Sequence, residues 1–105
     1  MAARVGSEDF QGEVLESEIP VLVDFYSDSC VPCKRLSPIL GEIEDAYEGK
    51  AKVVKVNVNF DGELAEQYEV MASPTVIFFQ DGKEVSRIRG LDKKSAYTTV
   101  LDSMV

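Results

Sequence analysis

Two cysteines, Cys30 and Cys33, are the residues best suited to chemistry, and they are the only cysteines among the 105 residues. They stand three apart, where an apolar run gives way to a helical pattern. On a forming helix, side chains at this spacing lie on one face, with about 5–6 Å between their Cβ atoms. A disulfide usually joins Cα atoms about 4.4–6.8 Å apart. The pair can therefore open and close without unfolding its surroundings, which predicts a redox-active dithiol.

The two thiols are predicted to have different roles. Cys30 falls at the junction of strand and helix, where the helix N-terminus and the nearby Lys34 and Arg35 supply positive charge. This setting favours the thiolate, the form that attacks a disulfide. Cys33 lies one turn further in and should keep its proton longer. We therefore expect Cys30 to attack a substrate disulfide and Cys33 to resolve the mixed disulfide. A purely structural disulfide is the alternative, although a four-residue loop constrains the unfolded chain little.

Asp24 is the second informative residue, because its strand neighbours are apolar on both faces. A carboxylate in the interior is costly to ionise, so its pKa rises and it becomes a proton acceptor near neutral pH. We expect it to serve Cys33 as a proton relay, with Lys55 on the neighbouring parallel strand as its partner. The alternative is a surface aspartate at a bulge.

Composition excludes several classes of function. The net charge of −8 leaves no basic stripe for nucleic acid. Without histidine, one chain cannot build a four-ligand Cys/His zinc site, nor can it use Ser-His or Cys-His catalysis. No apolar run approaches the roughly 18 residues of a membrane span, and no secretory signal is visible. We expect a cytoplasmic protein without metal or cofactor.

The pattern along the chain predicts a single domain over residues 1–105, with strands and helices in the order β-α-β-α-β-α-β-β-α. Its two parallel strands joined by a long helix should form a right-handed unit, and Asp81-Gly82 marks a tight hairpin. The result is a mixed sheet with helices on both faces. Ser7, Asp61 and Asp92 are predicted as helix caps, Pro38 as a kink in the long helix and Gly49 as its end.

Nearly the whole chain resembles the thioredoxin family. The resemblance rests on the CxPC motif after a strand, on an aspartate six residues before it, and on a Pro-Thr pair 41 residues after its second cysteine. It implies a thioredoxin fold, in which a five-stranded mixed sheet of order 1-3-2-4-5 is flanked by four helices. It also implies an exposed Cys30 as nucleophile, Cys33 as resolving thiol, and Asp24 as a buried acid beside Lys55.

The resemblance further implies a cis Pro74 facing the dithiol and a docking surface for substrate around it. That surface would consist of Val31, Pro32, Ser73, Gly90 and Leu91, with the Ser73 backbone holding the substrate peptide as an added strand. The implied activity is reduction of protein disulfides by a monomer that a thioredoxin reductase recharges, which maintains cell redox homeostasis.

Five positions depart from the family pattern. Ser29 replaces a tryptophan, Tyr26 stands where a second tryptophan is common, Val31 replaces a glycine, and Ser73 and Arg89 replace apolar residues. They alter the rim around the dithiol, and so affect the choice of partner more than the chemistry. Two alternatives remain at this point. One is a binding subunit that docks a partner regardless of redox state, and the other is a metal or iron–sulfur site shared across a dimer.

Overall fold

The computed structural model describes residues 2–105, in which strands and helices alternate before a final hairpin and helix. The first helical segment, η1, is a π-helix. In chain order the elements are β1 (Ala3–Arg4), η1 (Gln11–Leu15), β2 (Val21–Tyr26), α1 (Val31–Ala46), β3 (Lys52–Asn57), α2 (Gly62–Gln67), β4 (Thr75–Gln80), β5 (Lys83–Arg89) and α3 (Lys94–Met104).

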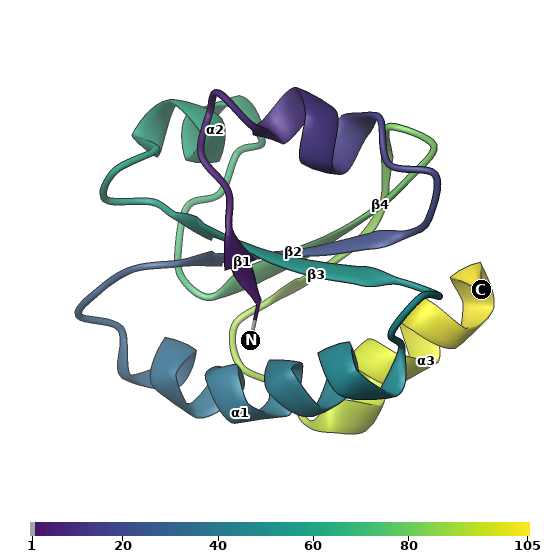
Figure 1. Cartoon of the computed structure of the whole chain (residues 1–105). Helices are drawn as coiled ribbons and strands as arrows, with labels where there is room; N and C mark the ends of the chain where they lie inside the picture. The colour runs from purple at the N-terminus through teal and green to yellow at the C-terminus, as the bar shows by residue number, and fades with distance from the viewer. Residues whose placement is uncertain (1) are drawn as a thin grey trace.

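One five-stranded sheet of order β1-β3-β2-β4-β5 forms the middle layer. β1, β3 and β2 run parallel, whereas β4 is antiparallel to both β2 and β5. Helices α1 and α3 cover one face, and η1 and α2 cover the other (Figure 1). The predicted fold class and strand order are confirmed. No helix within residues 2–105 has the length and apolar character needed to cross a membrane.

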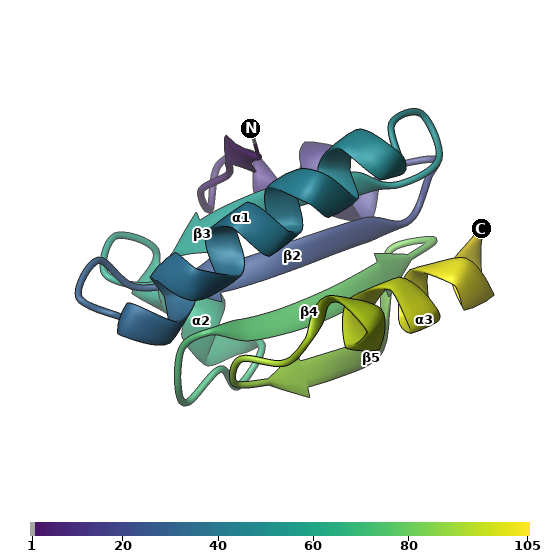
Figure 2. The ribbon, with the colours of Figure 1, turned by 90° about the horizontal axis from the view of Figure 1, so that it is seen from below.

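The central strand β2 is buried on both faces, as the uninterrupted apolar run predicts. Leu22 packs with Leu36 and Leu40 of α1 and with Tyr97 and Leu101 of α3. The view from below shows these two helices lying across the sheet (Figure 2). On the opposite face, alternate residues of β2 join an aromatic cluster, whose members include Phe10, Phe25, Tyr68 and Phe79. Two cores therefore fix β2, and the loop that follows it, in place.

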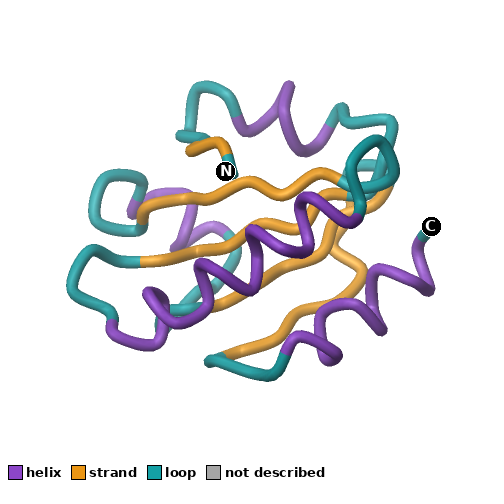
Figure 3. The backbone as a smooth tube through the Cα atoms, turned by 60° about the horizontal axis from the view of Figure 1, so that its bottom comes forward, coloured by secondary structure: helices purple, strands orange, loops and turns teal. Residues whose placement is uncertain are grey.

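The loops that follow β2 and β3 leave the sheet at the same end (Figure 3). Because β4 runs antiparallel to β2, the segment that enters β4 lies at this end too. The topology thus gathers the cysteine motif, the end of β3 and the Ser73-Pro74 segment, which are far apart in sequence.

Two of the three predicted helix caps are wrong, because Ser7 and Asp92 do not occupy cap positions. η1 starts after Phe10 rather than at Ser7, whose N–H donates to the Asp61 carboxylate over 3.1 Å. Asp61 occupies the cap position of α2 but makes no capping bond, since its Oδ1 is engaged by Ser7. Lys93 takes the cap position of α3, and Asp92 accepts a hydrogen bond from its N–H.

The hairpin between β4 and β5 has the two-residue turn that the sequence predicts. Asp81 and Gly82 both adopt positive φ angles, +54° and +77°, as a type I′ turn requires. Gly82 also passes close to the chain before β2, where a Cβ atom would lie 2.9 Å from the Leu15 carbonyl oxygen. This position therefore needs glycine for two separate reasons.

We expect Gly82→Ala to destabilise the protein more than Gly49→Ala does. Gly49 has a similar φ of +81°, but a Cβ atom there would meet nothing within 4 Å. Both changes force alanine into the left-handed region, and only Gly82→Ala adds a clash with backbone. The difference in free energy of unfolding should be roughly 1–3 kcal/mol, the usual cost of overpacking. Urea unfolding of the two variants measures it, and equal midpoints would contradict the close approach at Leu15.

Candidate active site

Cys30 and Cys33 form a disulfide at the start of α1, with their Cα atoms 5.2 Å apart. Cys30 occupies the cap position of the helix, and its Sγ accepts a hydrogen bond of 3.1 Å from the Cys33 N–H. Pro32 lies in the first turn, where its missing N–H costs no helical bond. The Cys30 sulfur thus replaces the oxygen of an ordinary capping residue and faces the positive end of the helix. This geometry would stabilise a thiolate at Cys30 after reduction.

Both cysteines are nearly buried, with exposed fractions of 9% for Cys30 and 6% for Cys33. The sequence predicts an exposed Cys30 and a more buried Cys33, and the structure shows a difference of only a few per cent. The reason is the segment before β4, because the Ser73 carbonyl oxygen lies 3.4 Å from the Cys30 Sγ. The Ser73 carbonyl therefore covers part of the Cys30 sulfur.

The Ser73-Pro74 segment lies beside the disulfide, and its peptide bond is cis. The Pro74 carbonyl accepts a hydrogen bond of 2.8 Å from the Gly90 N–H, which joins the end of β5 to the same site. Around it, Val31 and Leu91 are exposed apolar side chains, and Pro32 is exposed as well. The structure thus brings Ser73, Pro74 and Gly90 together, with exposed Leu91 next to Gly90 in the chain and exposed Val31 and Pro32 between the two cysteines.

Asp24 lies in the regular ladder of β2, between Lys55 of β3 and Val76 of β4, and not at a bulge. Only 1% of its surface is exposed, and neither carboxylate oxygen has a hydrogen bond within the described residues 2–105. Burial raises the pKa of Asp24 to about 7, and the positive charge of Lys55 offsets part of that rise. The carboxyl can therefore exchange a proton near neutral pH.

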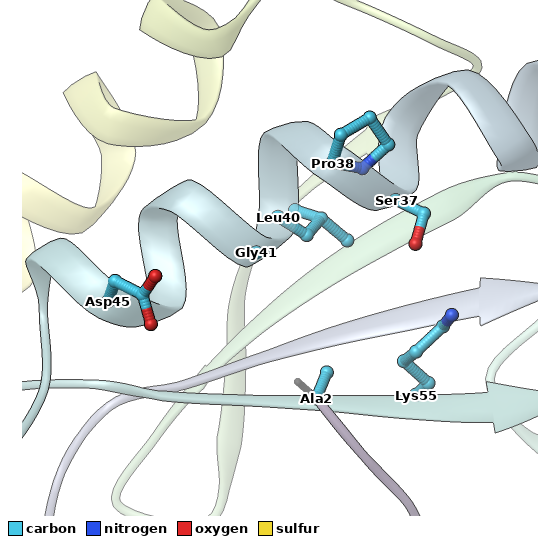
Figure 4. A pocket seen from close by; sticks show the side chains of 7 residues that line it. All are labelled: Ala2, Ser37, Pro38, Leu40, Gly41, Asp45 and Lys55. Atoms are coloured by element: carbon cyan, nitrogen blue, oxygen red, sulfur yellow. The ribbon is translucent and has the colours of Figure 1, made fainter.

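Lys55 is half-buried on the strand next to Asp24, but its amine contacts another side chain. The Nζ atom lies 4.6 Å from the centroid of the Tyr26 ring, in a cation–π contact. The lysine side chain rises from β3 toward the part of α1 that bears Ser37 (Figure 4). Lys55 therefore acts on Asp24 through its charge rather than through a hydrogen bond.

Two cavities have Lys55 and Ser37 in common among their lining residues. One, of about 180 Å³, is lined by Cys33 together with Tyr26, Ser27, Asp28 and Lys34. The other, of about 340 Å³, opens between α1 and β3 beside Ala2 and Asp45 (Figure 4). Lys55 and Ser37 line both cavities, so the cavity beside Cys33 and the cavity between α1 and β3 are neighbours.

Sequence reasoning missed Asn57, a fully buried polar residue at the end of β3. Its Nδ2 donates a hydrogen bond of 3.0 Å to Asp28, and the Asp28 N–H donates to Asn59 over 3.1 Å. These contacts fasten the loop before Cys30 to the neighbouring strand. Two asparagines directly after a β-branched strand were the available signal.

The comparisons with known proteins agree with this geometry. A family model described as Thioredoxin matches residues 2–103. Thioredoxin 1 of Nostoc sp. is 41% identical over 96% of this chain and 94% of its own length. Thioredoxin 1 of Synechococcus elongatus is 41% identical over 97% and 95%, and Thioredoxin of Rickettsia felis is 40% identical over 91% of both chains. With a cysteine pair that closes into a disulfide at this spacing, the chain is a thiol–disulfide oxidoreductase and belongs to the thioredoxin family.

Proposed function

We propose that this protein reduces the disulfides of other proteins, with Cys30 as nucleophile and Cys33 as resolving thiol. The observation that supports these roles is the hydrogen bond from the Cys33 N–H to the Cys30 sulfur at the cap of α1. It favours negative charge on Cys30 and not on Cys33. Cys30 is also the cysteine that lies against the Ser73 backbone, where a substrate peptide would approach.

The reaction transfers two electrons in two exchanges. The Cys30 thiolate attacks one sulfur of the substrate disulfide, and the other sulfur leaves as a thiolate that takes up a proton. Cys33 then loses its proton and attacks the Cys30 sulfur of the mixed disulfide. The substrate leaves with two thiols, and the protein is left with the Cys30–Cys33 disulfide seen in the structure.

Asp24 is proposed as the group that accepts the proton of Cys33. Its pKa of about 7 makes transfer feasible in both directions at neutral pH. Cys33 and Lys55 line the same cavity, and Lys55 is the neighbour of Asp24 in the β2–β3 ladder, so we infer that water in this cavity would carry the proton between the thiol and the carboxyl. Lys55 would stabilise the ionised carboxylate between turnovers.

Substrates are proposed to dock on Val31, Pro32, Ser73, Gly90 and Leu91. A peptide lying along Ser73 would add a short strand, with main-chain hydrogen bonds for affinity and its disulfide over Cys30. Pro74 would face the dithiol in this arrangement. The protein would act as a cytoplasmic monomer made of one domain, and a thioredoxin reductase would return it to the dithiol form.

Reduction of insulin disulfides by dithiothreitol tests the proposal. The protein should accelerate the reaction well beyond dithiothreitol alone, and Cys30→Ser should remove the acceleration because no nucleophile remains. The matched control is Ser95→Ala, which alters an exposed serine on α3 and leaves both thiols. Equal rates with the wild-type protein and Cys30→Ser would refute disulfide reduction and favour a redox-independent docking role.

A further inference from the structure

We propose that Ser27 is a positioning residue, whose hydroxyl holds the backbone of Ser73 beside the sulfur of Cys30. The inference rests on the proposed function, since it concerns how a substrate peptide is placed for attack. Ser27 is the first residue after β2, and Ser73 lies two residues before the start of β4. Both side chains are half-buried.

Ser27 and Ser73 lie opposite each other, just beyond the point where backbone pairing ends. β2 and β4 pair antiparallel from Val21 opposite Phe79 to Phe25 opposite Thr75. Continuing this register by two residues places Ser27 opposite Ser73. Pro74 stands between, and proline has no N–H with which to extend the ladder. At that position the two hydroxyl oxygens are 3.1 Å apart, so a side-chain hydrogen bond continues the pairing that the backbone cannot make.

Three contacts then close a ring that includes the nucleophile. The Ser27 hydroxyl bonds the Ser73 hydroxyl, the Ser73 carbonyl lies 3.4 Å from the Cys30 Sγ, and the Cys30 N–H donates to the Ser27 carbonyl over 3.4 Å. Removing the hydroxyl bond opens this ring at the side that faces the substrate. The Ser73 carbonyl would then no longer be held at a fixed distance from the sulfur.

The surroundings of the hydroxyl pair strengthen this hydrogen bond. Ser27 and Ser73 line a groove of about 230 Å³, together with Val58, Val70, Met71 and Ala72. Val58 and Val70 are partly buried and limit competition from water, whereas Met71 and Ala72 are exposed, so the bond is partly shielded from solvent.

The consequence concerns the placement of substrate rather than the reactivity of the thiol. A peptide held by the Ser73 backbone presents its disulfide to Cys30 only if backbone and sulfur keep their relative positions. Displacements of about 1 Å are enough to slow a reaction strongly. Ser27 is not assigned any contact with the reacting sulfur atoms, and it acts through Ser73.

The test is a double-mutant cycle with Ser27→Ala, Ser73→Ala and the double variant, assayed for reduction of insulin and of hydroxyethyl disulfide, which has no peptide backbone. Each single change should raise the KM for insulin about two- to tenfold, the range expected from one neutral hydrogen bond. The double variant should be no worse than either single one, because both remove the same contact. For Ser27→Ala, the loss with hydroxyethyl disulfide should be smaller than the loss with insulin.

Two further variants separate positioning from general damage. Ser27→Thr keeps a hydroxyl and should restore the KM, and Ser86→Ala, at a half-buried serine on β5, should leave it unchanged. The inference is wrong if wild-type protein reduces insulin and Ser27→Ala has the same KM, or if the two single effects multiply in the double variant. Wild-type protein that fails to accelerate insulin reduction would instead refute the proposed function itself.

Discussion

Changing Cys33 to serine should abolish turnover and leave the protein bound covalently to its substrate. Cys30 still attacks the substrate disulfide, but no second thiol is present to break the mixed disulfide that forms. In the wild-type protein the Cα atoms of Cys30 and Cys33 are 5.2 Å apart, so the attack of Cys33 on the mixed disulfide is intramolecular. Well-oriented intramolecular groups reach effective concentrations of about 10⁵ M or more, so turnover should fall by at least about a thousandfold. Non-reducing gels and intact-mass measurements should reveal covalent adducts with protein substrates.

The control is Cys30→Ser, which should form no adduct even though Cys33 is intact. The expectation follows from the geometry of the helix start, where only the Cys30 sulfur receives the N–H of its partner. Adducts formed by Cys30→Ser but not by Cys33→Ser would reverse the two roles. Adducts formed equally by both would mean that the cap of α1 does not distinguish the two thiols.

The stability of the oxidised protein should decrease as the pH rises, and Asp24 should be the cause. Its pKa is about 7 in the folded protein against an ordinary value of 3.8, so between these two pH values the unfolded chain loses a proton that the folded protein keeps. Ionisation of Asp24 in the unfolded chain therefore favours unfolding between these pH values. The free energy of unfolding decreases with rising pH until the pH exceeds the pKa of Asp24 in the folded protein. The loss from about pH 4 to pH 8 should be on the order of 4 kcal/mol.

Guanidinium unfolding at several pH values, with Asp24→Asn as reference, measures this effect. The amide does not ionise, so the variant should be the more stable protein at pH 8, by roughly 1–3 kcal/mol after the cost of burying an unpaired amide. In Lys55→Met, the pH range over which the protein loses stability should extend to higher pH than in the wild type, because the charge that lowers the pKa of Asp24 is lost. Parallel pH profiles for wild type and Asp24→Asn would show that another group controls stability.

Much of this fold can be predicted from sequence because its signals are local. The apolar run of β2, the helical spacing after Cys33 and the Asp-Gly turn each specify one element, and the connections leave few topologies. The helix caps could not be predicted in the same way. Asp61 has the residue type of a cap, yet its carboxylate binds Ser7, which lies 54 residues away in the sequence. A contact of this kind depends on the packed structure and not on any local pattern.

In the candidate site too, features with a local sequence signal could be predicted, and features that depend on tertiary contacts could not. The spacing of Cys30 and Cys33 and the apolar neighbours of Asp24 are local, and they are enough to predict a dithiol beside an interior carboxyl. The near-equal burial of the two cysteines depends on Ser73, which precedes the cis proline and lies 43 residues from Cys30 in the sequence. The partnership of Ser27 with Ser73 needs the register between β2 and β4, which no single stretch of sequence specifies.

The two outer strands of the sheet have a consequence for self-association. An outer strand with free backbone groups can pair with another copy of the same chain and begin aggregation. Here β1 has only two residues, and β5 bears Lys83, Glu84, Arg87 and Arg89 along its seven. A short strand and a highly charged one are poor templates for a neighbouring copy. The outer strands would therefore disfavour polymerisation even where, as proposed, the Ser73 backbone receives a foreign peptide.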